Sequence, residues 1–374
     1  MQRGRLSIVF VASILAWAHP AVAQTPATGT DLPWLPNSPS TRARDYSGPI
    51  VCASCHRAQA ARQATSEMGL SLARPARAAT LSAHPLMRYR RGKYTWTLRS
   101  SRGQATFTAD DGKQKIAAPL FMVIGSGKVF QAYLIEHRGA YARAAADYYA
   151  AQDKLGPEPD AGSALPADLE SALGKPLSAA DVRGCFHCHS PATVTMSGAF
   201  DTTRIAPGIT CEVCHGPGAK HGVAMRAGNR GDTAIFNPAH LRPEWQTSFC
   251  DQCHESAANM RAEHPHGVRS VISPDYRLEQ SRCFDAADAR SSCFFCHDPH
   301  APMERRMAAY DNKCLACHAS RGAVAGAGRP GKACPVALSN CAGCHMPRVT
   351  TPGSPIHFTD HRIRIAAAGA PYPE

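Results

Sequence analysis

The alternation of apolar and polar residues is clearest between residues 86 and 137. The large apolar residues Tyr94, Trp96 and Leu98 alternate there with polar ones. This two-residue period is typical of a half-buried strand. Dipeptides that favour tight turns occupy residues 102–103 and 111–112, and residues 120–124 form a short apolar run. The pattern predicts a small antiparallel β unit over residues 86–137.

Two later stretches have the composition of helices. Residues 140–153 are rich in alanine and tyrosine, and residues 166–183 have a similar character. We predict a helix over each stretch. From residue 184 onward no long periodic pattern occurs, so we expect short helices separated by loops rich in glycine and proline.

The first 48 residues are typical of an export signal followed by a leader. A basic start at Arg3 and Arg5 precedes a short apolar run, and Ala-Val-Ala at 21–23 is a small-residue cleavage site. The sequence predicts a signal peptide over residues 1–23 and a flexible leader over residues 24–48. No stretch approaches twenty apolar residues, so we expect an exported protein, periplasmic or extracellular, without a membrane span.

Cysteine carries the strongest signal in the chain. Fourteen of the sixteen cysteines fall into seven Cys-x-x-Cys-His units. Two thiols three residues apart can add to the two vinyl groups of one haem, and the adjoining histidine then binds the iron as its proximal ligand. A single cysteine pair would equally suggest a zinc site or a disulfide, whereas seven pairs that are all followed by histidine favour haem.

The sequence therefore predicts seven covalently bound haem c groups. The attaching cysteines are Cys52, Cys55, Cys185, Cys188, Cys211, Cys214, Cys250, Cys253, Cys293, Cys296, Cys314, Cys317, Cys341 and Cys344. The proximal iron ligands are His56, His189, His215, His254, His297, His318 and His345.

The composition agrees with a core made of haem. Aromatic residues make up only 7% of the chain, while Gly and Pro number 29 each. We expect a mainly α fold with much irregular structure, built around a stacked haem core, with the small antiparallel β unit between the first and second motifs. The predicted domains are residues 49–183, with the first haem and the β/α segment, and residues 184–365, with six haems, followed by a tail at 366–374.

The charge of the chain first suggests an acidic partner. Removal of the signal takes away two of the 41 basic residues and none of the 29 acidic ones, so the formal charge falls from +12 to +10. The propionates of seven haems would add about 14 negative charges and bring the total to about −4. The basic excess is therefore interpreted as compensation for propionates, and we expect no nucleic-acid partner.

Histidine supplies candidates for the second axial ligands. Ten histidines lie outside the signal and the motifs: His84, His137, His187, His221, His240, His264, His266, His300, His357 and His361. Every haem could thus have two histidines, which gives low-potential electron carriers. His221 and His300 lie too close to their own motifs to fold back, so each would serve a neighbouring haem. His361 follows the last motif, and His84 and His137 complete the candidate distal ligands.

Two cysteines remain outside the motifs. In an oxidising compartment an even remainder suggests one disulfide, between Cys283 and Cys334. Two buried thiols are the alternative, and a contact between a thiol and a haem is a third.

Several longer segments accompany the motifs: Cys52 to His56 with Met68-Gly69, Val123 to Gly127, Gly208 to Gly218, Cys293 to His300, Cys344 to Pro347 and Asp360 to Ile363. In these segments the chain resembles exported multihaem c-type cytochromes related to the tetrahaem cytochrome that accepts electrons from hydroxylamine oxidoreductase. The resemblance covers about residues 50–365. It implies electron transfer through closely stacked haems, often with a histidine after the Gly-Pro-Gly turn serving a neighbouring haem.

The resemblance has two departures. Seven haems exceed the four of the best-known member, and the helical repeats that follow in longer relatives are absent from this sequence. The redox partner is therefore not implied by the resemblance.

We expect an electron carrier that relays electrons between a membrane quinol-side donor and a terminal reductase or outer-membrane conduit. An oxidoreductase acting on nitrite, hydroxylamine or a similar small molecule is the alternative. Related nitrite reductases commonly replace the motif histidine by lysine, and no Cys-x-x-Cys-Lys occurs here. A third hypothesis is a filament-forming or structural cytochrome, in which haem stacks continue through a homo-oligomer.

Overall fold

The structure is a computed structural model that describes residues 41–159, 161–190, 193, 200–231, 234–263, 267–318, 334–351 and 355–366. The predicted signal peptide, most of the predicted leader and nearly all of the predicted tail lie outside these residues. The predicted domain boundaries therefore stay predictions. Within the described residues no helix is both long enough and apolar enough to cross a membrane.

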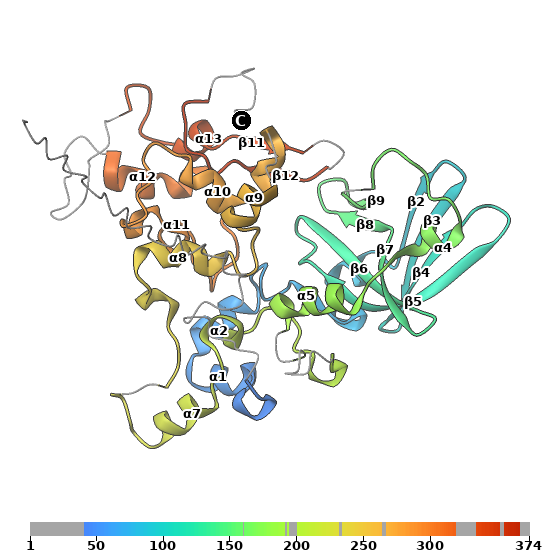
Figure 1. Ribbon diagram of the computed structural model, residues 1–374, viewed down its shortest axis with the longest axis horizontal. Coiled ribbons are helices and arrows are strands. Elements are labelled where there is room, and N and C mark those ends of the chain that lie inside the picture. Colours follow the sequence, from blue (N-terminus) through green and yellow to red (C-terminus); the bar gives the residue numbers. More distant parts are fainter. Residues whose placement is uncertain are drawn as a thin grey trace, which may run out of the picture. The chain divides into compact units, whose positions relative to one another are not determined.

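An antiparallel sheet follows the first motif (Figure 1). Its strands are β1 Leu72–Ala73, β2 Leu86–Arg91, β3 Tyr94–Ser101, β4 Gln104–Asp110, β5 Lys115–Ile124, β6 Phe130–His137, β7 Ala140–Ala144, β8 Ala146–Tyr149, β9 Lys154–Pro157 and β10 Gly174–Pro176. The main path runs β10-β7-β6-β5-β4-β3-β2, while β1 pairs with β5, β8 with β6, and β9 with β8. The sheet is larger than the predicted β unit, because it begins before residue 86 and continues beyond residue 137.

The turn chemistry of the sequence explains the hairpin between β3 and β4. Arg102 and Gly103 both have positive φ, at 51° and 78°, between the paired residues Ser101 and Gln104. A two-residue turn with positive φ at both positions matches the right-handed twist of the flanking strands, and glycine tolerates it well. The turn predicted at this position is confirmed.

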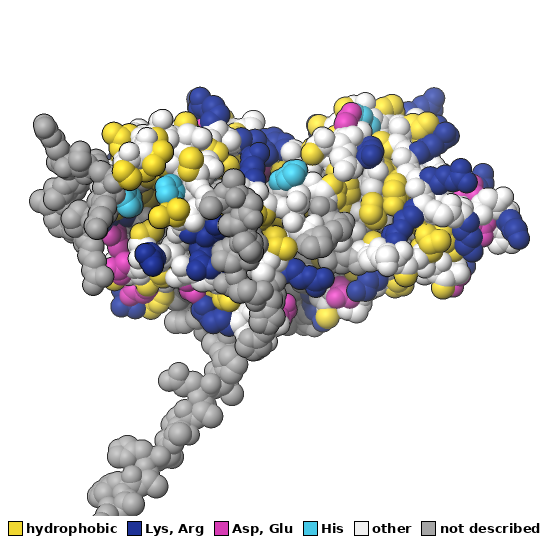
Figure 2. All heavy atoms as spheres, turned by 90° about the horizontal axis from the view of Figure 1, so that it is seen from above, with side chains coloured by type: hydrophobic (Ala, Val, Ile, Leu, Met, Phe, Trp, Pro, Cys, Tyr) yellow, Lys and Arg dark blue, Asp and Glu magenta, His cyan; other side chains and the backbone are white. Residues whose placement is uncertain are grey.

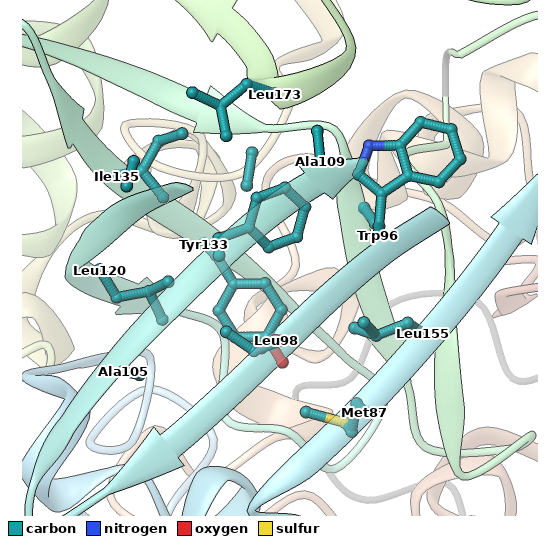
Figure 3. Packing of buried hydrophobic residues seen from close by; sticks show 14 of the residues in the cluster. Met87, Trp96, Leu98, Ala105, Ala109, Leu120, Tyr133, Ile135, Leu155 and Leu173 are labelled. Atoms are coloured by element: carbon teal, nitrogen blue, oxygen red, sulfur yellow. The ribbon is translucent and has the colours of Figure 1, made fainter. Parts of the chain in front are cut away.

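The alternation along β3 buries one face of the sheet. Tyr94, Trp96 and Leu98 are at most 3% exposed, and they pack with Tyr133, Ile135 and other side chains of the sheet into one apolar cluster (Figure 3). The indole Nε1 of Trp96 donates a hydrogen bond to the carbonyl of Ala172 at 2.6 Å, so the polar edge of the ring is satisfied within the core.

The predicted helix over residues 140–153 is wrong, because these residues form strands β7 and β8. Alanine and tyrosine indicated a helix by composition alone, without a helical period. In the sheet, alternate residues such as Ala142 and Ala144 are buried against the core. Tertiary packing has here overridden local propensity.

The helix predicted over residues 166–183 is interrupted. Helix α4 spans Leu169–Leu173, strand β10 follows, and helix α5 spans Ala179–His189. A side chain at Gly174 would place its Cβ 2.3 Å from the carbonyl oxygen of Arg143 on β7. Glycine thus permits the close strand pairing that separates the two helices.

The remaining helices are short, and loops separate most of them (Figure 1). They are α1 Pro49–Cys55, α2 Arg57–Gln63, α3 Ala79–Ala83, α6 Cys211–His215, α7 Ala219–Arg226, α8 Pro243–Cys250, α9 Ala257–Glu263, α10 Pro274–Glu279, α11 Cys293–Cys296, α12 Asp311–His318 and α13 Cys341–His345. A small hairpin joins β11 Arg348–Thr350 and β12 His357–Thr359.

The apolar core is concentrated in the sheet. Of the twelve largest fully buried side chains among the described residues, only Phe186 and Arg277 lie beyond residue 183. The part of the chain that carries six of the seven motifs therefore buries few large apolar side chains of its own, which leaves room for another apolar component.

Candidate haem-binding site

Each motif lies on or directly after a short helix. In chain order the motifs are the first at Cys52–His56, the second at Cys185–His189, the third at Cys211–His215, the fourth at Cys250–His254, the fifth at Cys293–His297, the sixth at Cys314–His318 and the seventh at Cys341–His345. In a helix, residues three apart lie on the same face, so one turn presents both sulfurs of a motif to one side. The local fold therefore suits attachment of one planar group per motif.

Three motif histidines face a second histidine from another part of the chain. The pairs are His56 with His221, His215 with His300, and His297 with His361. Their ring centroids are separated by 6.2, 6.1 and 6.3 Å in that order. All three second histidines are ones that the sequence favoured as distal ligands.

These separations fit an iron ion between the rings. Two imidazole nitrogens that each bind one metal at about 2 Å, with each centroid about 1.1 Å behind its nitrogen, place the centroids about 6.2 Å apart. Rings in direct contact have centroids about 4.5–7 Å apart, so the separation is compatible with an intervening iron and gains its meaning from the motif histidine in each pair. The residues present thus fit haem iron at the first, third and fifth motifs.

Backbone carbonyls orient several of these rings. The Nδ1 atom of His215 donates to the carbonyl of Phe236 at 2.9 Å, and Nδ1 of His361 donates to the carbonyl of Thr359 at 3.0 Å. At the seventh motif, Nδ1 of His345 donates to the carbonyl of Arg364 at 2.8 Å. A carbonyl can only accept, so Nδ1 carries the proton and Nε2 keeps the lone pair that a metal requires.

Burial also keeps these imidazoles neutral. It lowers the pKa of His361 to about 4, with the nearby His297 as a smaller cause. Burial likewise lowers the pKa of His189, His215 and His297. A neutral imidazole is the form that binds a metal ion, so these environments favour ligation at neutral pH.

Thiols from different motifs lie close enough to perturb one another's pKa. The contacts join Cys52 with Cys211, Cys188 with Cys253, Cys250 with Cys293, and Cys314 with Cys341. In a haem-loaded protein these sulfurs would be thioethers, so the contacts indicate which motifs are neighbours, not protons shared between thiols. The motifs are arranged as close neighbours although up to 159 residues separate the members of a contact.

A buried glutamate ties the first motif to the third. Glu212 lies inside the third motif and is 5% exposed. Its Oε1 accepts hydrogen bonds from the backbone amides of Ser47 at 2.7 Å and Gly218 at 2.8 Å, and its Oε2 accepts from the amide of Gly48 at 2.9 Å. The carboxylate therefore fixes the start of α1 and the start of α7, which carries His221.

A buried ion pair holds the segment around His361. Arg277 on α10 donates from Nε and Nη2 to the two carboxylate oxygens of Asp360, at 3.0 and 3.1 Å. Both side chains are fully buried. Asp360 also accepts from the backbone amide of Arg362 at 3.0 Å, so the carboxylate fixes the backbone on both sides of His361.

Other predicted distal ligands lie elsewhere. His84 contacts Asp153 at 3.1 Å and His137 contacts Glu170 at 3.0 Å, both at the sheet, and the structure does not bring either to a motif histidine. His240 lies 3.4 Å from the amide of Asn237. His264 and His266 lie outside the described residues.

The two cysteines outside the motifs are free in the structure, so the predicted disulfide is not formed. Cys283 lies near Cys317 of the sixth motif, and burial and this neighbour raise the pKa of its thiol. A contact between this thiol and a haem stays a prediction.

Sequence reasoning missed Glu212 and Arg277. Glu212 stands inside a motif, where only the cysteines and the histidine carry a known signal, and Arg277 has no sequence signal at all. Both side chains hold backbone segments in place because they are buried and hydrogen-bonded, and this burial could not be seen in the sequence.

Helical Cys-x-x-Cys-His motifs, histidine pairs with metal-ligand spacing and a sparse apolar core define a multihaem c-type cytochrome. In agreement, residues 164–216, which contain the second and third motifs, match the family described as cytochrome c554 and c-prime. No curated protein matches the chain.

Among solved structures, the chain is similar to one titled "Crystal Structure of Outer Cell Wall Cytochrome OcwA". The identity is 16% and the TM-score 0.39, over 86% of this chain and 80% of that chain. A similarity this distant carries no argument about function.

Proposed function

We propose that the protein is a heptahaem electron carrier that is exported to the periplasm or the cell surface. The observation that carries this proposal is the three histidine pairs with centroids 6.1 to 6.3 Å apart. An iron with two imidazoles has no open position for a substrate, and such a site suits electron transfer at low potential.

Different residues would attach the haem and bind its iron. The paired cysteines of each motif would hold one haem covalently, and the motif histidine would bind its iron. Bound haem supplies one-electron chemistry at the iron. His221, His300 and His361 would close the second axial position at the first, third and fifth motifs, while the carbonyl partners of His215 and His361 hold the rings with Nε2 toward the metal.

The partners and the location follow from the same proposal. The basic start and cleavage site at the N-terminus support export, and covalent attachment suits a cofactor that must not be lost outside the cytoplasm. Redox proteins are the expected partners: a membrane quinol-side donor and a terminal reductase or outer-membrane conduit. On the face seen in Figure 2, lysine and arginine side chains stand among acidic and hydrophobic ones.

The test is low-temperature electron paramagnetic resonance of the oxidised holoprotein and of three single variants. His221→Ala, His300→Ala and His361→Ala should each convert one low-spin haem to high spin without loss of haem. His240→Ala, which removes a histidine bonded to Asn237, is the matched control and should leave the spectrum unchanged. If all three variants keep the parent spectrum, these histidines are not ligands and the proposal loses its main support.

A further inference from the structure

The contacts between motifs define an order that differs from the order along the chain. At one end, the first motif meets the third through Glu212 and through the contact of Cys52 with Cys211. At the other end, Asp311 at the start of α12 accepts hydrogen bonds from the amides of Asn340 and Cys341, at 2.7 and 2.8 Å. This second contact joins the sixth motif to the seventh.

The fifth motif lies next to the sixth. The ring of His297 is 5.6 Å from the ring of Tyr310, in an edge-on arrangement, and Tyr310 directly precedes α12. The thiols of Cys296 and Cys314 are also close enough to interact electrostatically. The fifth, sixth and seventh motifs therefore follow one another in space as they do in the sequence.

The fourth motif contacts the fifth. The ring of Phe249, which precedes the fourth motif, lies 6.2 Å from the ring of Phe294, inside the fifth. The thiols of Cys250 and Cys293 are also close enough to interact. These contacts place the first cysteine of one motif against the first cysteine of the other.

The fourth motif also lies beside the third. Phe236, whose carbonyl accepts the hydrogen bond from His215, packs with its ring 5.8 Å from Phe249. In addition, the thiol of Cys214 is close enough to interact electrostatically with the cysteines of the fourth motif. A continuous series therefore runs through the first, third, fourth, fifth, sixth and seventh motifs.

The second motif joins this series from the side. The thiol of Cys188 donates to the carbonyl of Gln252 at 3.5 Å and is in contact with Cys253. Gln252 and Cys253 both belong to the fourth motif and lie at its second cysteine. The fifth motif instead contacts the first cysteine of the fourth motif, Cys250. The second and fifth motifs therefore contact different cysteines of the fourth motif.

We infer that the haem of the fourth motif is a branch point with three neighbouring haems, so that the electron path has three ends: the first, the second and the seventh haem. This inference rests on the proposed function, since it requires haem at every motif. Electron transfer between haems becomes much slower as their separation grows, so neighbours at close range define the path. A path with three ends can distribute electrons from one donor to two acceptors, or collect them from two donors.

The test is to locate the irons by anomalous X-ray scattering in crystals of the unaltered, haem-loaded protein. The iron on His254 should have the irons on His189, His215 and His297 as near neighbours, while the iron on His189 has no near neighbour other than the iron on His254. Seven irons in an unbranched series would overturn the branch and leave the proposed electron carrier intact. Fewer than seven haem irons would instead overturn the proposed function, and the branch with it.

Discussion

At the scale of single residues, two buried carboxylates organise the histidines that face the motifs. Glu212 accepts three backbone amide hydrogens at one end of the motif series, and Asp360 receives the guanidinium of Arg277 near the fifth motif. Each carboxylate fixes the backbone beside a candidate ligand. This is the arrangement expected of groups that orient metal ligands from behind.

The variant Glu212→Gln tests the first carboxylate. An amide offers one acceptor oxygen where the carboxylate offers two, so one of the three backbone amides loses its partner in a buried site. We expect the free energy of unfolding to fall by about 1–3 kcal/mol, measured by guanidinium denaturation of the holoprotein. Glu263→Gln changes an exposed side chain on α9 and is the matched control. Equal stabilities of the two variants would contradict the role assigned to Glu212.

The variant Arg277→Met tests the ion pair. Removal of the guanidinium leaves the buried Asp360 with only the more distant Arg364, at 3.5 Å, as a cationic partner, and loss of one member of a buried ion pair typically costs about 3–5 kcal/mol. Because Asp360 fixes the backbone around His361, we also expect one haem to gain high-spin character, and Arg277→Lys should restore the low-spin spectrum in part. Arg306→Met, which breaks a pair whose arginine is 82% exposed, should change neither quantity. A purely structural role for Arg277 would show the loss of stability with an unchanged spectrum.

The sequence singled out His221, His300 and His361, which the structure places opposite motif histidines, but it did not reveal the surroundings of these residues. Cys-x-x-Cys-His is a local pattern, and His221 and His300 stand at fixed short distances from a motif, so local reasoning reaches them. Partners such as Arg277 and Asp360 are 83 residues apart, and only the folded chain brings them together. His84 and His137 lie far from any motif in the sequence, so local reasoning could not tell that their partners are Asp153 and Glu170.

At the scale of elements, the sheet shows that the periodicity of a sequence and its composition differ in how well they predict secondary structure. The alternation at Tyr94, Trp96 and Leu98 is a period, and it correctly predicted strand β3. The alanines and tyrosines of residues 140–153 are a composition, and they gave the wrong element. A period reports which side chains share a face, whereas composition reports only a weak preference that packing can override.

A buried charge within the sheet makes stability depend on pH. Asp147 on β8 is fully buried and pairs with Arg143 at 2.6 Å, yet burial outweighs this partner and raises the pKa of the carboxyl from 3.8 to about 6. The native state therefore holds the proton more tightly than the unfolded state. The stabilisation from this group is complete below about pH 4 and is lost as the pH rises to about 6.

The comparison of the parent with Asp147→Asn isolates this effect. Melting temperatures of both proteins are measured at pH 4.5 and at pH 7. The parent should lose more stability than the variant between the two values, because asparagine does not titrate. A parent that gains stability relative to the variant over this interval would show that the carboxyl is ionised at a lower pH than proposed.

At the scale of the whole molecule, the sparse core of the motif region has a direct consequence. Most of the large buried side chains belong to the sheet, while six motifs lie on short helices joined by loops. Short helices of this kind are only marginally stable without tertiary packing. The account therefore requires the haems to supply the apolar surface that the polypeptide lacks, and the fold of this region to depend on their attachment.

The central claim is that seven haems are bound covalently to one exported chain, and intact-mass spectrometry of the denatured protein tests it most directly. The protein is produced in a host that attaches haem c, and noncovalent groups are lost on denaturation while thioether-linked haem is retained. We expect the mass of the chain beginning at Gln24 plus seven haems. A mass with no added haem, or with fewer than seven while free motif thiols remain, would contradict it.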